Sequence, residues 1–224
     1  MSDSFENPLN HQPSFGFDQV KVVQKENRYD GFFTLDSYQF RHPLYQGGHS
    51  NIVKRELLER GDAVVVLPYD PKTGEVVLVE QFRVGAYGAF ERDVRANKTA
   101  QSPWLIECIA GMVDKNREAI DVAHAEAKEE AGIELSNVQS VMTLFASPGG
   151  MSERIEYFVA TTDSTKAKGV HGLDSESEDI RVLRVSLETA CNWISEGKIN
   201  NASTVIALQW LQLKKAEYLR QCGL

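Results

Sequence analysis

A continuous apolar run, AVVVL at residues 63–67, narrows the folds that this chain can adopt. A strand that is apolar at every position is covered on both of its faces, so its sheet needs a packing layer on each side. Residues 70–74 (DPKTG) have the composition of a turn, and the apolar residues 76–79 follow as the second arm of a hairpin. The main domain, which begins at Gly61, is therefore expected to be built on a buried sheet.

Strands and helices alternate through the rest of the chain. Further strands are predicted at residues 104–109, 139–144, 155–160 and 180–185, and helices at about 118–131, 187–197 and 203–220. Residues 86–103 have weak periodicity and are expected to form a long loop. Helices that pack on a sheet place the chain in the mixed α+β class.

The first 60 residues differ in character from the main domain. Residues 1–16 are polar, contain two prolines and are expected to form a flexible arm. Short strands at 20–23, 33–40 and 52–57, separated by turns, predict a small antiparallel β domain at 17–60, ahead of the main domain at 61–224. A three-stranded unit of this size has little core of its own, so we expect it to pack on another surface.

Charge and cysteine content exclude several classes of protein. The formal net charge is −8, whereas non-specific nucleic-acid binding depends on basic patches that face phosphates. No window is long and apolar enough to cross a membrane, and the N-terminus lacks the basic start and apolar core of a signal peptide. The three cysteines match no zinc pattern and are interpreted as free thiols in a reducing compartment. We therefore expect a cytoplasmic protein that binds neither nucleic acid nor membrane.

The segment richest in chemical groups is residues 111–133, GMVDKNREAIDVAHAEAKEEAGI. On a helix, Glu126, Glu129 and Glu130 lie three and four positions apart, so their carboxylates crowd one face. The like charges repel one another, and the negative end of the helix dipole disfavours them further. A cluster of hard oxygen ligands suits Mg²⁺ or Mn²⁺, and the alternative interpretation is a solvated acidic face.

This segment resembles the Nudix box, G-x5-E-x7-R-E-U-x-E-E-x-G-U, in which U is a bulky apolar residue. The residues in register are Gly111, Glu126, Glu129, Glu130, Gly132 and Ile133. The chain departs from the pattern at Arg117, which stands in place of the first Glu, and at Ala125, which stands in place of the Arg. In the family those two residues help to hold the loop and the helix, so their replacement bears on how well the ligands are preorganised.

The resemblance extends to the bacterial ADP-ribose pyrophosphatases over nearly all of residues 25–220. The runs that carry it are 105–112 (LIECIAGM), 147–153 (SPGGMSE), 171–173 (HGL) with 176–180 (ESEDI), and 207–211 (ALQWL). It implies a Nudix α-β-α sandwich with a mixed sheet. It also implies metal-dependent hydrolysis of ADP-ribose, a nucleoside diphosphate sugar, to AMP and ribose 5-phosphate, with Mg²⁺ or Mn²⁺ as the cofactor.

The resemblance further implies roles for single residues. Glu126 and Glu130 would bind most of the metal, joined by the Ala110 backbone carbonyl and assisted by Glu129. Arg83 would bind the substrate phosphates, although a lone Arg at a strand end is more often a surface charge.

Four more substrate contacts are implied outside the box. Arg55 would reach the nucleotide from a partner subunit, and Glu153 would hold the terminal ribose hydroxyls. Phe32 or Phe33 would stack on the adenine, although an aromatic residue at that spacing more often belongs to a core. The predicted assembly is a symmetric homodimer in which each small N-terminal sheet is swapped onto the neighbouring Nudix domain.

The catalytic base is expected outside the helix, because a carboxylate bound to a metal accepts protons poorly. Residues 163–179 are polar, contain two glycines and lack a helical or strand period, so they are interpreted as a mobile loop. Glu176 and Glu178 are two positions apart and would point the same way in an extended segment. In the resembling enzymes this loop supplies the base and a further metal contact. Glu176 is assigned as the base, with Glu178 as the second candidate and a metal helper, and a solvated acidic loop is the alternative.

Three other functions fit parts of the sequence. A Nudix enzyme of the same branch with another substrate, such as a GDP-sugar or a dinucleoside polyphosphate, has the same box. A non-catalytic ADP-ribose sensor fits the changes at Arg117 and Ala125, although a degraded site is expected to lose a ligand glutamate first. A structural protein with an acidic helix leaves the SPGG and HGL runs unexplained.

Overall fold

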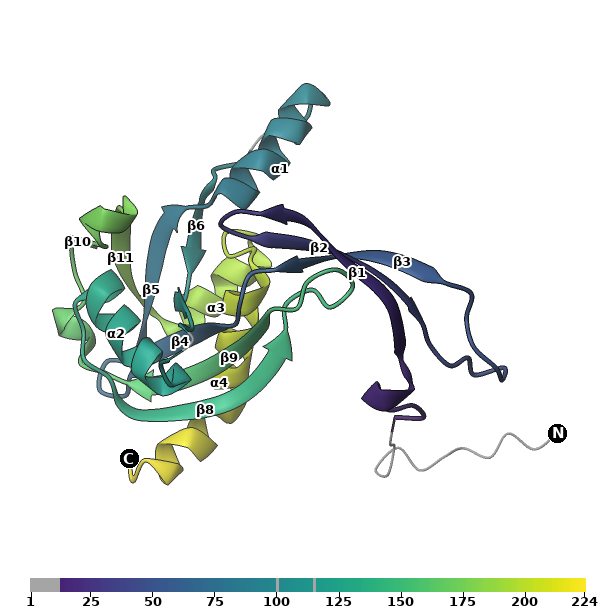
Figure 1. The fold of residues 1–224 in the computed structure, drawn as a ribbon. Coiled ribbons are helices and arrows are strands. Elements are labelled where there is room, and N and C mark those ends of the chain that lie inside the picture. Colours follow the sequence, from purple (N-terminus) through teal and green to yellow (C-terminus); the bar gives the residue numbers. More distant parts are fainter. Residues whose placement is uncertain (1–12, 100, 115) are drawn as a thin grey trace. The chain divides into compact units, whose positions relative to one another are not determined.

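A computed structural model describes residues 13–224 apart from residues 100 and 115, and the chain divides into two compact units (Figure 1). The first unit holds the residues up to Arg60 together with Ala146–Glu153. The second unit holds Gly61–Phe145 and Arg154–Leu224. Most of the arm expected at 1–16 lies outside the described residues.

The first unit is a three-stranded antiparallel sheet, as the sequence predicted. Its strands are β1 (Lys21–Asp30), β2 (Thr34–Arg41) and β3 (Val53–Glu59), in that order across the sheet, and a 3-10 helix (Phe17–Gln19) precedes them. The SPGG segment lies alongside β3, where the Leu58 amide donates to the Gly150 carbonyl at 2.8 Å. Almost every residue of β1 is exposed, so this unit has little interior.

The second unit contains a mixed sheet in the order β10-β11-β5-β4-β9-β8, in which β6 pairs with β5 and β7 pairs with β4. Its strands are β4 (Ala63–Asp70), β5 (Glu75–Phe82), β6 (Trp104–Glu107), β7 (Ile109–Met112), β8 (Ser136–Phe145), β9 (Arg154–Thr161), β10 (Val170–His171) and β11 (Ile180–Ser186). Strands β4 and β9 run parallel, and the other neighbours are antiparallel. The single strand predicted at 104–109 is two strands, because the chain changes partner at Cys108.

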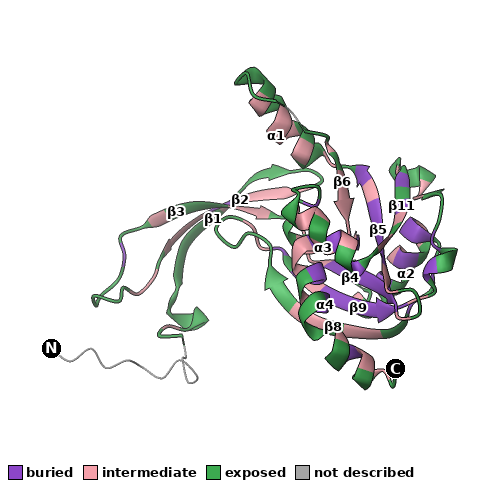
Figure 2. Ribbon diagram, turned by 180° about the vertical axis from the view of Figure 1, so that it is seen from behind, coloured by how far each residue is buried: buried purple, intermediate pink, exposed green. Residues whose placement is uncertain are grey.

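Helices cover both faces of this sheet, which gives the α-β-α sandwich (Figures 1 and 2). Helix α2 (Ala119–Ala131) shares a core cluster with Val64 and Val66 of β4. Helices α3 (Leu187–Ser195) and α4 (Ala202–Gln221) share a second cluster with Val65 and Leu67. Strand β4 is therefore buried on both faces, as its apolar run predicted. Within the described part of the chain, no helix is long and apolar enough to span a bilayer.

The prediction of a loop over 86–103 is wrong, because α1 (Val84–Arg95) occupies most of that stretch. None of its side chains is buried, so the helix adds nothing to the core of the second unit. Local contacts support it instead, among them the Glu91–Arg95 ion pair at 2.8 Å, one turn apart. The two glycines of the segment, Gly85 and Gly88, further weaken the helical signal in the sequence.

Candidate active site

Strand β5 leads from the core to a polar site under α2. Alternate residues of a strand face the same side, and Val77 and Val79 pack in the core cluster that α2 covers. The next residue on that face is Gln81, whose Nε2 donates to Oε1 of Glu130 on α2 at 3.4 Å. The apolar side chains on this face of β5 therefore end at Gln81, which contacts a carboxylate of α2.

Glu130 is the most deeply buried of the predicted metal ligands, with 2% of its surface exposed. Its second oxygen, Oε2, accepts a hydrogen bond from the Ala110 amide at 3.2 Å. Burial raises the pKa of Glu130 to about 8, and the Glu126 charge adds to the rise, whereas the Ala110 amide and Arg83 oppose it. Two neutral donors therefore fix the carboxylate without neutralising it.

Glu126 lies one helical turn earlier and packs directly on Gly111. A methyl group added at Gly111 would overlap the Glu126 carboxylate and displace it from its present position. Burial raises the pKa of Glu126 to about 7, and the charges of Glu129, Glu178 and Glu176 reinforce the rise. The structure thus brings the two candidate base residues of the loop within electrostatic reach of the α2 cluster.

The departures from the box face the same region. Arg117 is exposed just before α2, and its Nη2 donates to the Asp121 carbonyl at 3.3 Å. Its charge acts to lower the pKa of Glu126, against the larger effect of burial. Ala125 is half-buried and offers no polar atom beyond its backbone. A cation therefore stands where the box has an acid, close enough to influence a predicted ligand.

The segment 163–179 is attached to α2 at its middle and carries short elements of its own. The Gly172 amide donates to the Glu129 carbonyl at 3.2 Å, and the His171 ring lies against Gly132, where a methyl group would overlap it. A 3-10 helix spans Asp174–Glu176, and Ser177 has a φ of 55°. The premise of an extended segment at Glu176 is therefore wrong.

The two loop carboxylates differ in their surroundings. Glu178 is half-buried, and its Oε2 accepts a hydrogen bond from the Leu173 amide at 3.1 Å. Glu176 is exposed at the end of the 3-10 helix. One carboxylate is held by its own loop, and the other is accessible to solvent.

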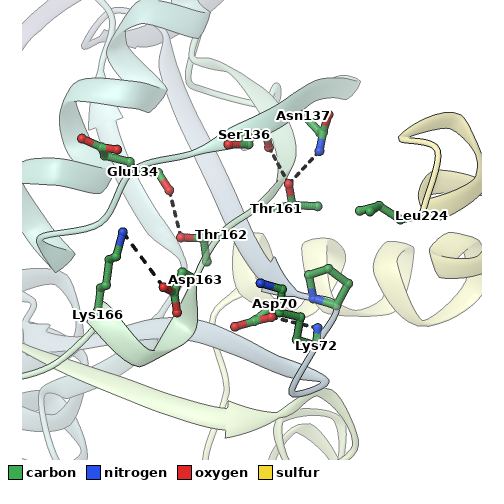
Figure 3. Close-up of a pocket in the computed structure, with 11 residues that line it drawn as sticks. Asp70, Lys72, Glu134, Ser136, Asn137, Thr161, Thr162, Asp163, Lys166 and Leu224 are labelled. Atoms are coloured by element: carbon green, nitrogen blue, oxygen red, sulfur yellow. Dashed lines mark hydrogen bonds and ion pairs between the residues drawn. The ribbon is translucent and has the colours of Figure 1, made fainter.

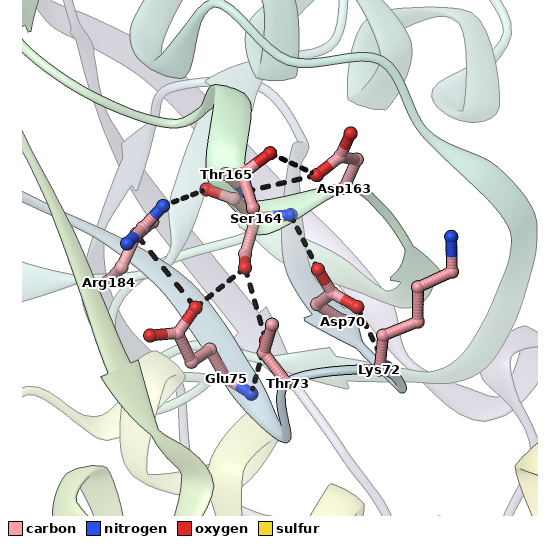
Figure 4. Close-up of polar contacts among 8 residues, drawn as sticks. All are labelled: Asp70, Lys72, Thr73, Glu75, Asp163, Ser164, Thr165 and Arg184. Carbon is pink, nitrogen blue, oxygen red and sulfur yellow. Dashed lines mark hydrogen bonds and ion pairs between the residues drawn. The ribbon is translucent and has the colours of Figure 1, made fainter.

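A buried polar network fastens the start of this segment to the hairpin β4–β5 (Figure 4). The fully buried Ser164 donates its amide to Asp70 Oδ2 at 2.8 Å and its hydroxyl to Glu75 Oε2 at 2.7 Å. Arg184 donates to the Ser164 carbonyl at 3.1 Å and lies 3.8 Å from Glu75. The loop therefore begins from a rigid point.

Arg83 follows β5 directly and forms an ion pair that the sequence did not predict. Its Nε lies 2.7 Å from Oε2 of Glu107, which is the last residue of β6. Burial raises the pKa of Glu107, although the Arg83 charge opposes this. Gln81 and Glu107 were both missed. The available signals were a polar residue at a core-facing position of β5 and the acid within the LIEC run.

The remaining predicted substrate contacts belong to the first unit. Arg55 is exposed on β3, and Phe32 and Phe33 form an edge-to-face pair with centroids 4.9 Å apart. Glu153 is buried, and its Oε1 lies 3.3 Å from Nε of Arg60, whose guanidinium lies over the Phe33 ring. Within this unit Phe33 and Glu153 are thus linked through Arg60, a residue that the sequence interpretation did not single out.

The predicted ligand set suits a hard divalent cation. Its groups are carboxylates and a backbone carbonyl, which Mg²⁺ and Mn²⁺ prefer. Across residues 13–224 without 100 and 115, no three His, Cys, Asp or Glu side chains already converge on a point that could hold a metal. Mg²⁺ does not need such a cage, because it retains waters and binds through one or two carboxylates. Burial, reinforced by the neighbouring carboxylates, raises the pKa values of Glu126 and Glu130, and a bound cation would favour the charged form of both groups.

A cavity of about 310 Å³ lies elsewhere in the second unit (Figure 3). Among its lining residues are Lys72, Glu134, Thr162, Lys166 and Leu224, and none of the predicted site residues is among them. The predicted site residues therefore lie outside this cavity.

Comparisons with known proteins show which family and which relatives this chain resembles. The NUDIX domain family matches residues 59–219. The ADP-ribose pyrophosphatase of Escherichia coli (strain K12) is 48% identical over 206 residues, which cover 92% of this chain and 94% of that protein. A GDP-mannose pyrophosphatase of Escherichia coli (strain UTI89 / UPEC) is 34% identical over 87% of this chain and 96% of its own length. The crystal structure of an ADP compounds hydrolase has a TM-score of 0.63 at 18% identity, covers 90% of this chain and 98% of its own, and shares the fold.

Proposed function

The chain belongs to the Nudix family, and from this we propose that it hydrolyses the pyrophosphate of ADP-ribose to AMP and ribose 5-phosphate. The observation that carries the proposal is the group of carboxylates on α2, with Glu126 and Glu130 beside the Arg83 end of β5. The 48% identity to an ADP-ribose pyrophosphatase over 92% of the chain supports this substrate. The 34% identity to a GDP-mannose pyrophosphatase makes a GDP-sugar the natural competitor in any assay.

We assign Glu126 and Glu130 as the main metal ligands, with the Ala110 carbonyl as a third and Glu129 in support. When bound there, Mg²⁺ or Mn²⁺ would polarise a phosphoryl oxygen and lower the pKa of an attacking water. The Ala110 amide and Gln81 hold Glu130 from the protein side, so its outward lone pairs are fixed before any ligand arrives.

The other residues of the second unit act on the substrate. Arg83 binds the phosphates, since a guanidinium matches the geometry of phosphate oxygens. The Glu176 carboxylate accepts a proton from the attacking water as the water oxygen bonds to one phosphorus and the bond to the bridging oxygen breaks. Glu178 is the second candidate for this role and a metal helper.

The first unit supplies the nucleoside and sugar contacts. We propose that Arg55 contacts the nucleotide bound by the partner subunit, that Phe32 or Phe33 stacks on the adenine, and that Glu153 accepts hydrogen bonds from the terminal ribose hydroxyls. Phe32 is 82% exposed and offers its ring face to a ligand, whereas Phe33 is shared with Arg60. Between the two aromatic residues, exposure therefore favours Phe32.

Incubation with ADP-ribose and Mg²⁺ is expected to release AMP, and chelation of the metal should abolish that release. Equal concentrations of GDP-mannose in the same mixture should compete weakly. Faster cleavage of GDP-mannose than of ADP-ribose would show that the main substrate is another nucleoside diphosphate sugar. Binding of ADP-ribose without AMP release at any Mg²⁺ or Mn²⁺ concentration would indicate a sensor instead.

We propose that the chain is a symmetric homodimer in which the N-terminal sheet is swapped onto the neighbouring subunit. The exposed apolar residues of β1, Val22, Val23 and Tyr29, are 54–61% exposed and would gain cover in such an assembly. Light scattering at micromolar concentration should give twice the chain mass of 25.1 kDa. A fully active monomer would exclude the swap.

We also place the protein in the cytoplasm. Cys108, Cys191 and Cys222 are free thiols. Free thiols are typical of a reducing compartment.

A further inference from the structure

The Arg83 backbone is fixed at the junction between β5 and α1. Its amide donates to the Pro103 carbonyl at 2.9 Å, and its carbonyl accepts from the Tyr87 amide at 3.0 Å. Arg83 is also the N-cap residue of α1. From this point the side chain has two directions open to it, either outward along α1 or back along β5.

The ion pair with Glu107 shows that the side chain turns back along β5. Glu107 lies opposite Val79, four residues before Arg83, which is roughly 13 Å along a strand. The Arg83 Nε is nevertheless 2.7 Å from Glu107 Oε2. The gap closes only if both side chains extend along the strands toward each other.

This direction brings the guanidinium toward the carboxylates of α2. Val79, Gln81 and Arg83 alternate along β5 and share one face, and Gln81 already contacts Glu130. The ion pair with Glu107 holds the Arg83 side chain in this direction.

The bond to Glu107 uses only one of the nitrogens of Arg83. A guanidinium carries five N–H donors in a rigid fork, so engaging Nε leaves the two terminal nitrogens for another partner. The Glu107 side chain is only 13% exposed, whereas that of Arg83 is 42% exposed. The buried acid is therefore the fixed partner, and the arginine can still reach a ligand.

We propose that Glu107 is a positioning residue for the reaction, which holds Arg83 toward the α2 carboxylates with its terminal nitrogens directed at the substrate pyrophosphate. The inference rests on the role of Arg83 under the proposed function. Glu107 itself does not touch the substrate, so its effect on catalysis must pass through Arg83.

A double-mutant cycle in the full chain tests this dependence. The variants are Glu107→Leu, Arg83→Ala and the two combined, with Glu80→Gln as the matched control. Glu80→Gln weakens a more exposed ion pair on the same strand, where Glu80 lies 3.2 Å from Arg181. We expect kcat/KM for ADP-ribose to fall about 10–100-fold in Glu107→Leu, about the cost of misplacing a binding group. The fall in kcat/KM should be smaller in Glu107→Gln, which keeps an acceptor oxygen. The kcat/KM of Glu80→Gln should stay within about twofold of the parent value.

In the Arg83→Ala background, Glu107→Leu should lower kcat/KM by no more than about a further twofold, because the side chain that Glu107 holds is already absent. An equal loss in both backgrounds would overturn the proposal, because Glu107 would then act on the fold and not through Arg83. Parent-like kcat/KM in Glu107→Leu, with Arg83→Ala impaired, would overturn it as well.

A second readout is independent of turnover. The NMR signal of the Arg83 Nε–H, identified by its absence in Arg83→Ala, should exchange slowly with water in the parent and rapidly in Glu107→Leu. If the parent does not cleave ADP-ribose, the proposed function fails while this measurement still decides whether Glu107 holds Arg83. Unchanged exchange in Glu107→Leu would overturn the proposal in either case.

Discussion

Glu130→Gln is expected to lower the turnover of ADP-ribose by at least about 100-fold while the fold survives. Glu130 is buried, and its two oxygens are held by the Ala110 amide and Gln81, so its place in the site is set by the protein. An amide of the same size keeps one acceptor oxygen and removes the charge. Burial already raises the pKa of Glu130 to about 8, so loss of its charge costs the metal-free fold little at neutral pH.

Two measurements distinguish a loss of metal binding in Glu130→Gln from a loss of the folded structure. The kcat at saturating Mg²⁺ gives the catalytic loss, and the melting temperature with and without Mg²⁺ gives the loss of metal binding. The parent should gain melting temperature with Mg²⁺, and Glu130→Gln should lose most of that gain but match the parent in chelator. Glu134→Gln, an exposed acid just beyond α2, is the control. Near-parent turnover in both Glu126→Gln and Glu130→Gln would show that the ligand assignment is wrong.

Glu176→Gln should reduce kcat by about 10²–10⁴ and leave KM nearly unchanged, as loss of a general base does. Glu176 is exposed, and its charge still reaches Glu126. Glu178 is instead held by the Leu173 amide, which leaves its carboxylate less able to follow a substrate. Of the two loop acids, Glu176 is therefore the better placed to take a proton.

The comparison that matters is with Glu178→Gln, made and assayed separately. We expect that variant to require more Mg²⁺ for full activity, in keeping with a metal helper. Asp174→Asn changes an exposed acid on the same 3-10 helix and should behave as the parent. If Glu178→Gln is the crippled variant and Glu176→Gln is near normal, the two roles are exchanged. If neither variant is impaired, the loop takes no part in the chemistry.

Sequence patterns predicted the parts of the fold that a buried core imposes. The run at β4 indicated a strand covered on both faces, and α3 and α4 were predicted from the apolar positions that they bury against the sheet. Helix α1 was not predicted. It buries no side chain, so its residues are not constrained by packing against a core. The left-handed backbone conformation at Ser177 could not be predicted either, because a positive φ is uncommon for serine.

The candidate site divides in a similar way. The three glutamates of α2 were singled out because helix geometry places them on one face and because the segment resembles the Nudix box. Gln81 and Glu107 were missed because their partners are 49 and 24 residues away in the chain. Such pairs depend on which strands become neighbours, which a single sequence does not state.

The network around Ser164 limits how the loop that carries Glu176 can move. Ser164 is held by Asp70 and Glu75, β10 pairs with β11, and the Gly172 amide is bonded to α2, so any swing of the loop begins beyond Gly172. The part that must become ordered when a ligand arrives is then the seven residues 173–179 and not the whole of 163–179. Ordering a residue costs about 1–2 kcal/mol in backbone entropy, so a short swinging arm opposes ligand binding less than a long one.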